Sequence, residues 1–207
     1  KELSTFKNLA QLDLGFTKIT DACLKDLATL TKIAVLSLQG TKVTDAGLKE
    51  LAALENLTEL NLSNTQITGK SLKELASLNR LTILIVNDMK LTDADLRELA
   101  KLSNLTDLRL NRTKVTDAGL KALAPLKKLS THELASTAVT DAGLDEPAPL
   151  TDLVFLDICR TAITDVGLRK LSGLKRLEYI DLHGLKVSDA GVAEFQRALP
   201  KCAIRRE

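Results

Sequence analysis

The chain has 207 residues, of which 44% are hydrophobic but only 2% are aromatic, so a hydrophobic core must be built almost wholly from Leu, Val, Ile and Ala. With 29 basic and 27 acidic residues, the overall charge favours neither nucleic acid nor an anionic membrane as a partner. No apolar stretch reaches the roughly 20 residues that cross a bilayer, so we expect no membrane span.

The cysteines give no sign of a metal or redox site. Cys23, Cys159 and Cys202 are odd in number, far apart and outside any C-x-x-C motif. Unpaired thiols fit a reducing compartment best, which favours the cytoplasm. No nucleophile stands in a pattern with a base and an orienting group, so we expect no catalytic residues, no cofactor and no enzyme activity.

Apolar residues recur every 24 positions in eight repeats, in the pattern L-x-x-L-x-L. The central position of this pattern is occupied by Leu12, Leu36, Leu60, Leu84, Leu108, His132, Leu156 and Ile180. Alternate apolar residues indicate a short strand with one buried side. The period therefore predicts eight parallel strands, of which the first lies near Leu12.

A second segment of each repeat follows the pattern T-D-A-G-L-K-E-L-A-x-L, as at Thr116 and Asp117. Its apolar spacing predicts a short helix that begins at each Thr-Asp pair. The hydroxyl and the carboxylate there can cap free N–H groups of the first turn. A calcium-binding ladder is the alternative role for the aspartates, and we favour capping because the helix dipole attracts an anion at this position. The aspartates are Asp21, Asp45, Asp93, Asp117, Asp141, Asp165 and Asp189.

One strand and one short helix cannot bury both apolar faces alone, so the repeats must stack into an α/β solenoid with the parallel sheet on its concave side. The L-x-x-L-x-L signature resembles that of leucine-rich-repeat proteins over essentially the whole chain. The T-D-A-G-L version resembles bacterial repeats related to the cysteine-containing subfamily. The resemblance implies a right-handed horseshoe and a single domain over residues 1–207. Thr replaces the usual Asn or Cys after the strand, and Met89 and Leu185 break that series.

The two ends of the chain differ. Residues 1–6 match the helical tail of a repeat, so we expect the chain to begin within a repeat and to belong to a longer protein. Residues 193–207 contain Phe195 in place of a helix Leu and end in a charged tail. We predict that this segment caps the stack.

Repeat six departs from the pattern, since His132 takes an inward Leu position and Pro147, followed by Pro149, takes a helix Leu position. Proline inside a helix costs about 3 kcal/mol, and a buried polar group without a partner costs about 1–3 kcal/mol. We predict an irregular segment over residues 145–149. Two interpretations stay open: chance substitutions that the flanking repeats tolerate, or a break that opens a binding notch.

The outward strand positions vary from repeat to repeat while the inward ones stay apolar, so function is expected in the variable set. Phe155 and Tyr179 should lie about 5 Å apart on adjacent strands, with Asp157 and Asp181 beside them. This arrangement suits a basic, hydrophobic partner segment, although isolated exposed apolar residues are also ordinary. The candidate partner-binding residues are Phe16, Val35, Ile83, Ile85, Arg109, Arg112, Phe155, Asp157, Arg160, Tyr179 and Asp181.

Two functions remain on these grounds. The first is a protein–protein interaction scaffold that binds a macromolecular partner on its concave face. The alternative is a set of substrate-recognition repeats in a larger enzyme or effector, such as a ubiquitin-ligase-like protein. The sequence upstream of Lys1 would distinguish the two.

Overall fold

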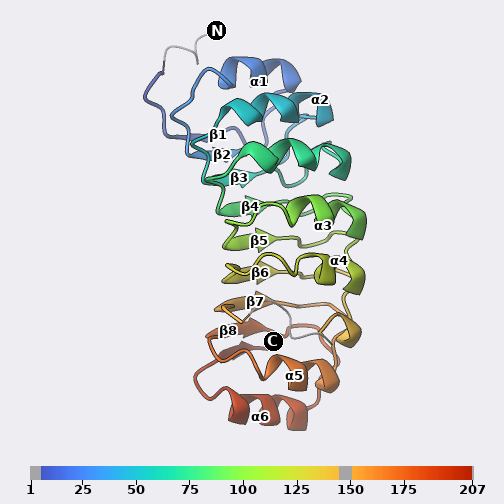
Figure 1. Ribbon diagram of the computed structural model, residues 1–207. Helices are drawn as coiled ribbons and strands as arrows, with labels where there is room; N and C mark the ends of the chain where they lie inside the picture. The colour runs from blue at the N-terminus through green and yellow to red at the C-terminus, as the bar shows by residue number, and fades with distance from the viewer. Residues whose placement is uncertain (1–5, 145–150, 207) are drawn as a thin grey trace.

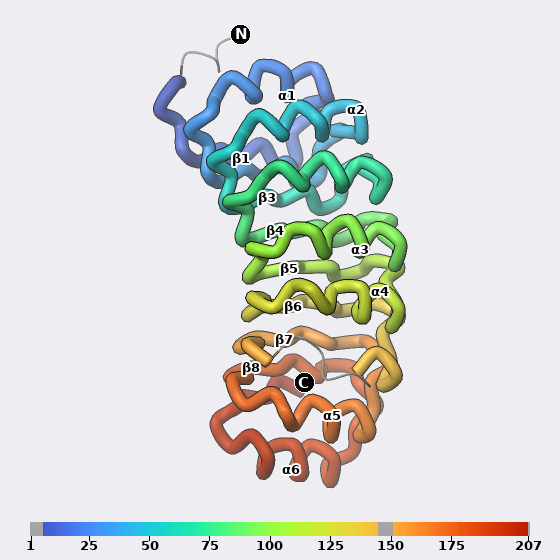
Figure 2. Tube along the Cα trace, in the orientation of Figure 1, coloured from blue at the N-terminus to red at the C-terminus, as the bar shows by residue number. Residues whose placement is uncertain are grey.

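The chain folds into an elongated stack in which helices form one layer and strands form the other (Figures 1 and 2). The computed structural model describes residues 6–144 and 151–206. The predicted irregular segment over 145–149, with Pro147 and Pro149, lies outside the described residues, as do residues 1–5. No helix in the described part of the chain combines the length and the apolar character needed to cross a bilayer.

The strands form one parallel sheet in which each strand pairs with the next along the chain. Positions 24 residues apart are partners throughout the described residues, as in Leu12 with Leu36. The eight predicted strands are confirmed, but the sheet contains a ninth. That strand was missed because Lys201 and Arg206 stand at two of the three positions that are apolar in the other repeats. The strands are β1 (Gln11–Asp13), β2 (Val35–Ser37), β3 (Glu59–Asn61), β4 (Ile83–Ile85), β5 (Asp107–Arg109), β6 (Thr131–Glu133), β7 (Phe155–Asp157), β8 (Tyr179–Asp181) and β9 (Ala203–Arg205).

Most helices begin at the predicted Thr-Asp pairs, whereas one begins at Gly69 and another follows Ser188, and several are 3-10 rather than α-helices. The α-helices of the described residues are α1 (Asp21–Leu27), α2 (Asp45–Leu48), α3 (Asp93–Leu99), α4 (Asp117–Ala122), α5 (Asp165–Leu171) and α6 (Asp189–Ala198). The 3-10 helices are η2 (Lys49–Ala53), η3 (Gly69–Ser77) and η4 (Asp141–Leu144). Their leucines pack with the central strand residues in a single continuous core.

The threonine that precedes each helix caps it in several repeats, as predicted. The Thr116 hydroxyl, for example, accepts the N–H of Ala118 at 3.3 Å. The threonines that follow the strands have a separate role. Thr41 donates its hydroxyl to the carbonyl of Leu38 at 2.7 Å, and the equivalent threonines make the same bond in their own repeats.

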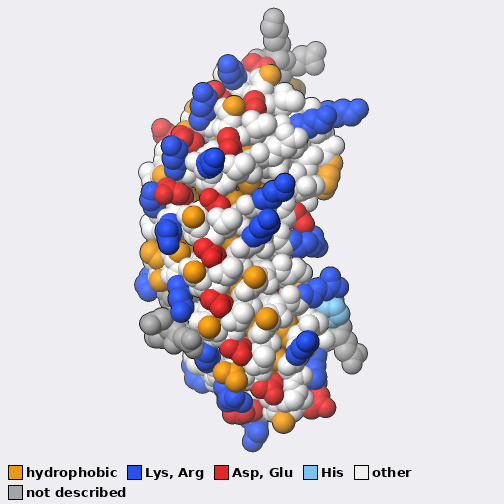
Figure 3. Space-filling view, turned by 90° about the vertical axis from the view of Figure 1, so that its right-hand side faces the viewer, with side chains coloured by type: hydrophobic (Ala, Val, Ile, Leu, Met, Phe, Trp, Pro, Cys, Tyr) orange, Lys and Arg blue, Asp and Glu red, His pale blue; other side chains and the backbone are white. Residues whose placement is uncertain are grey.

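The aspartates bind the neighbouring repeat rather than their own helix, which corrects the predicted capping role. One carboxylate oxygen of Asp21 accepts the backbone N–H of Thr44 at 2.8 Å, and the other accepts the Thr44 hydroxyl at 2.7 Å. Five further aspartates bind the next repeat in the same way, namely Asp45, Asp93, Asp117, Asp141 and Asp165. Figure 3 shows acidic side chains that recur along one side of the stack, with basic side chains on both margins.

The glycine of the T-D-A-G pattern makes room for this aspartate. A Cβ atom at Gly47 would overlap the carboxylate of Asp21 from the preceding repeat. Between repeats three and four the two residue types exchange places. Gly69 stands where other repeats have Asp, and Asp95 stands where they have Gly. Asp95 accepts both the N–H of Thr92, at 2.8 Å, and its hydroxyl, at 2.9 Å.

His132 lies in the core with a fully buried side chain, at the predicted inward position. Its Nδ1 is 2.8 Å from the carbonyl of Leu108, which can only accept, so this nitrogen carries the proton. Nε2 is buried and has no hydrogen-bond partner among the described residues. Burial lowers the pKa of His132 below its ordinary 6.5, although the Leu108 carbonyl and Asp107 partly oppose the shift.

We expect Gly69→Asp to lower the free energy of unfolding by about 1–3 kcal/mol, because the new side chain would overlap Asp95. The double variant Gly69→Asp with Asp95→Gly restores the arrangement of the other interfaces and should recover most of the loss. Urea unfolding of the wild type, Gly69→Asp and the double variant measures both effects. A double variant that is no more stable than Gly69→Asp would contradict the exchange.

We expect His132→Leu to raise the free energy of unfolding by about 1 kcal/mol near neutral pH, because it removes an unpaired buried acceptor. The gain should grow as the pH falls below 6.5, because the unfolded chain then binds a proton that the folded His132 resists. Urea unfolding at about pH 7 and about pH 5 tests this. If the wild type and His132→Leu lost the same free energy of unfolding on acidification, His132 would not be the titrating group.

Candidate binding surface

The outward side of the sheet, called the strand face here, consists of the first and third residues of each strand. These lie on the opposite side from the buried central residue because side chains alternate along a strand. The first row is Gln11, Val35, Glu59, Ile83, Asp107, Thr131, Phe155, Tyr179 and Ala203. The second row is Asp13, Ser37, Asn61, Ile85, Arg109, Glu133, Asp157, Asp181 and Arg205.

The predicted binding residues fall into separate groups on this surface. Val35 lies in β2, and Ile83 and Ile85 lie together in β4, all half-buried. Arg109 lies in the adjacent strand β5. A further group consists of the predicted residues in β7 and β8, namely Phe155, Asp157, Tyr179 and Asp181.

Three predicted residues lie beyond the strand ends rather than in the two rows. Phe16, Arg112 and Arg160 each occupy a left-handed turn position, with φ of 57°, 54° and 54°. Phe16 is 73% exposed, and its ring lies against Gly40 of the next repeat. Arg112 pairs with Asp88 at 3.1 Å. Of these three residues, only Arg160 lies beside the group in β7 and β8, because it follows β7 in the chain.

Phe155 and Tyr179 are neighbours on adjacent strands, as predicted, and their rings form a parallel stack. Their ring centroids are 4.9 Å apart and the ring planes differ by 3°. The separation matches the spacing of neighbouring strands, so the two rings stand side by side on the sheet. Both side chains are half-buried, and together they give the strand face a rigid apolar element.

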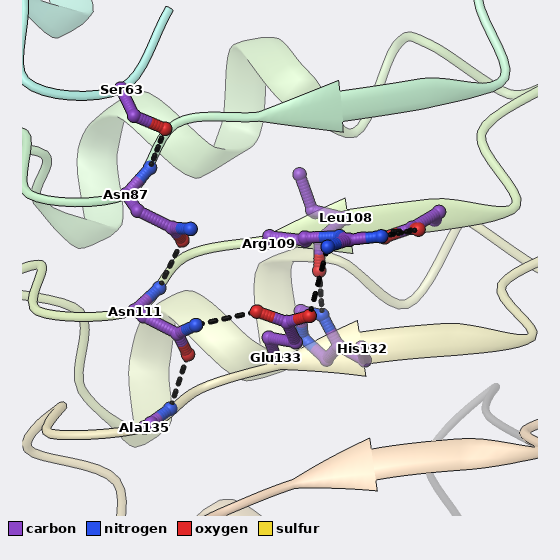
Figure 4. Close-up of polar contacts among 9 residues, drawn as sticks. Ser63, Asn87, Leu108, Arg109, Asn111, His132, Glu133 and Ala135 are labelled. Carbon is purple, nitrogen blue, oxygen red and sulfur yellow. Dashed lines mark hydrogen bonds and ion pairs between the residues drawn. The ribbon is translucent and has the colours of Figure 1, made fainter. Parts of the chain in front are cut away.

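Arg109 is held by carboxylates of its own chain (Figure 4). Its guanidinium contacts Asp107 at 2.8 Å and Glu133 at 3.3 Å, so it bridges β5 and β6. The hydrogen bond to Asp107 raises the pKa of Arg109. Burial raises the pKa of Glu133, although the charge of Arg109 partly offsets the effect. Arg109 thus stabilises the surface, a role that its outward position in the repeat pattern did not predict.

An amide ladder lies beside this network at the ends of the strands (Figure 4). The side-chain carbonyl of Asn87 accepts the N–H of Asn111 at 2.8 Å, and that of Asn111 accepts the N–H of Ala135 at 2.7 Å. The amide of Asn111 also donates to Glu133 at 2.5 Å. These hydrogen bonds between repeats were not predicted, and the recurrence of Asn 24 residues apart was the available signal.

Asp157 and Asp181 converge with Cys159 at the other end of the strand face. The donor atoms of the three side chains lie within 4.8 Å of one another. Asp157 accepts the N–H of Cys159, and Asp181 accepts that of His183, each at 2.9 Å. Asp181 also pairs with Arg205 at 3.3 Å.

Cys159 was not among the predicted binding residues. Burial first, then the hydrogen bond and negative charge of Asp157, raises the pKa of its thiol to about 12. The thiol is therefore protonated near neutral pH and adds no charge of its own. Carboxylates and thiols are donor types that metals use, but here both carboxylates already accept backbone N–H groups.

The strand face is acidic, although the whole chain has a net charge of +2. Its two rows contain only two basic residues, Arg109 and Arg205. The acidic residues of the rows are Asp13, Glu59, Asp107, Glu133, Asp157 and Asp181. Four of these six lie in neighbouring strands from β5 to β8, and Asp157 among them has no ion-pair partner in the described part of the chain.

We expect Cys159 to react with iodoacetamide at about pH 8.5 at least tenfold more slowly than a free thiol, because its raised pKa leaves little thiolate. Asp157→Asn should speed the reaction several-fold by removing the neighbouring charge. Mass spectrometry of the peptides that contain each cysteine gives the separate rates. An unchanged Cys159 rate in the variant would show that Asp157 does not control the thiol.

Comparisons with known proteins agree with this architecture. The model of the family described as leucine-rich repeat region matches residues 1–205. A solved internalin (inlF) from Listeria monocytogenes has 26% sequence identity and a TM-score of 0.76, over 98% of this chain and 55% of that one. Internalin C2 from the same organism has 25% identity and a TM-score of 0.73, over 97% of this chain and 83% of that one.

This chain thus spans about half the length of the first of these internalins. A search of curated proteins gave no match. The match to the family model runs through every strand and helix described above. The chain belongs to the leucine-rich-repeat family.

Proposed function

We propose that this chain is a protein–protein interaction scaffold that binds a macromolecular partner on its strand face. The observation that carries the proposal is the stacked pair of Phe155 and Tyr179, which lies in an outward row beside Asp157 and Asp181. Aromatic residues are favoured at the centre of binding interfaces because a large rigid side chain loses little entropy when a partner covers it.

The contrast between the two sides of the sheet supports this role. The central strand residues are almost all Leu or Ile and are buried, whereas the outward rows contain aromatic, aliphatic, acidic and basic residues. Repeat proteins present such variable positions on a constant framework. Folding already orders the sheet, so the strand face loses little conformational entropy when a partner binds.

The chemistry of the reactive side chains favours binding over catalysis. His132 is buried in the core with Nδ1 bonded to a carbonyl, so it has no access to a substrate. Cys159 has a thiol pKa of about 12 and is therefore a poor nucleophile near neutral pH. We accordingly propose a scaffold rather than an enzyme.

Phe155→Ala and Tyr179→Ala should each weaken a macromolecular partner by about 1–3 kcal/mol, as loss of central aromatic anchors usually does. Lys49→Ala is the matched control on the helix layer, where Lys49 is the exposed first residue of η2. The partner would be isolated with the wild-type chain, and binding curves would then be measured for each variant after circular dichroism has shown that it is folded. Binding that tolerates both aromatic substitutions but is lost in Lys49→Ala would place the interface on the helices.

A further inference from the structure

Each ring of the aromatic stack uses one face for the other ring, and the described residues form no further aromatic stack on the outer faces. Phe155 and Tyr179 cover one another, so their other faces point along the sheet toward the neighbouring strands. The first-row neighbour of Phe155 is Thr131, and that of Tyr179 is Ala203. Both neighbours are small residues, so each outer ring face stands above a short side chain.

The two sides differ in charge. On the Tyr179 side, Arg205 already pairs with Asp181 at 3.3 Å, and it would repel a second cation. On the Phe155 side, Asp157 has no ion-pair partner among the described residues. Glu133 in the adjacent strand already pairs with Arg109 at 3.3 Å, so Asp157 is the carboxylate that remains for a cation there. A cation above Thr131 would lie about 5 Å from the Phe155 ring, which is within the range of a cation–π contact.

Resting on the proposed function, we propose that the strand face over β6 to β8 binds a basic peptide segment. One Arg or Lys of that segment lies against the outer face of Phe155 above Thr131 and pairs with Asp157. The partner is cationic because the outward rows carry six carboxylates and only two guanidinium groups, in a chain whose net charge is +2. An acidic segment would be repelled from the same place.

Tyr179 makes this site directly observable, because it is the only tyrosine and the chain has no tryptophan. Tyrosine fluorescence therefore reports from within the proposed site. The probe is a short peptide of alternating Arg and Gly, which has no fluorescence of its own, titrated into the full chain with EDTA present. A peptide of alternating Glu and Gly is the charge control. We expect a saturable change with the basic peptide that weakens as salt is added, and none with the acidic one.

Asp157→Asn removes the proposed charge and retains the local hydrogen bond. Asn61 occupies the same position in β3 and accepts the N–H of Ser63 at 3.0 Å, as Asp157 accepts that of Cys159. We expect Asp157→Asn to weaken the basic peptide about fivefold. Asp13→Asn is the matched control, because Asp13 accepts the N–H of Gly15 at 2.8 Å at the far end of the same row. It should change the affinity by less than about twofold.

A second pair of variants tests the position above Thr131 while every carboxylate of the strand face is kept. Thr131→Lys places a cation of the chain beside Phe155 and should abolish the tyrosine response to the basic peptide. Gln11→Lys adds the same charge in the first row of β1 and should leave the response within about twofold. Thermal unfolding of each variant shows whether its sheet is intact.

The proposal is overturned if Asp157→Asn and Asp13→Asn bind the basic peptide equally, if Thr131→Lys binds as wild type does, or if the acidic peptide gives the same response. These outcomes concern the class of partner alone. The proposed scaffold function would still stand if an isolated partner were weakened by Phe155→Ala but not by Asp157→Asn. The scaffold function would fail if neither Phe155→Ala nor Tyr179→Ala weakened the binding of that partner.

Discussion

The structure depends on one constraint, the in-register pairing of positions 24 residues apart. Each repeat contributes only three strand residues and a short helix, so it buries its apolar side only against its neighbours. The bonds between repeats reinforce that register. The carboxylate of Asp21 holds both the N–H and the hydroxyl of Thr44, and Gly47 leaves space for it. A residue at any position therefore lies beside its equivalents and contributes to a row.

The strand face inherits its properties from the same register. Phe155 stacks on Tyr179 because the two are register partners, and Asp157 lies beside Asp181 for the same reason. Although the outward rows vary, the register gathers six carboxylates and two aromatic rings on one face, a character that the overall composition hides. An almost neutral chain thus presents an acidic face with an aromatic element, and the intramolecular pairs of Arg109 and Arg205 neutralise only part of it.

Much of this arrangement follows from the sequence period, because alternation decides which strand residues are buried and register decides which are adjacent. The positions of eight strands, the helix starts and the contact of Phe155 with Tyr179 were predictable on that basis. Hydrogen-bond partners were not, because a carboxylate such as that of Asp21 lies within reach of its own helix and of the next repeat. The exchange of Gly69 with Asp95 appears as two unrelated departures until the repeats are stacked.

The proposed binding site is the strand face over β6 to β8. Its most direct test is the measurement of backbone amide chemical shifts of the isotope-labelled chain during titration with the alternating Arg and Gly peptide. The largest changes are expected at Thr131, Phe155, Asp157 and Tyr179, with small changes in α1 to α6. Changes concentrated in the helices, or in β1 to β4, would contradict binding at this site.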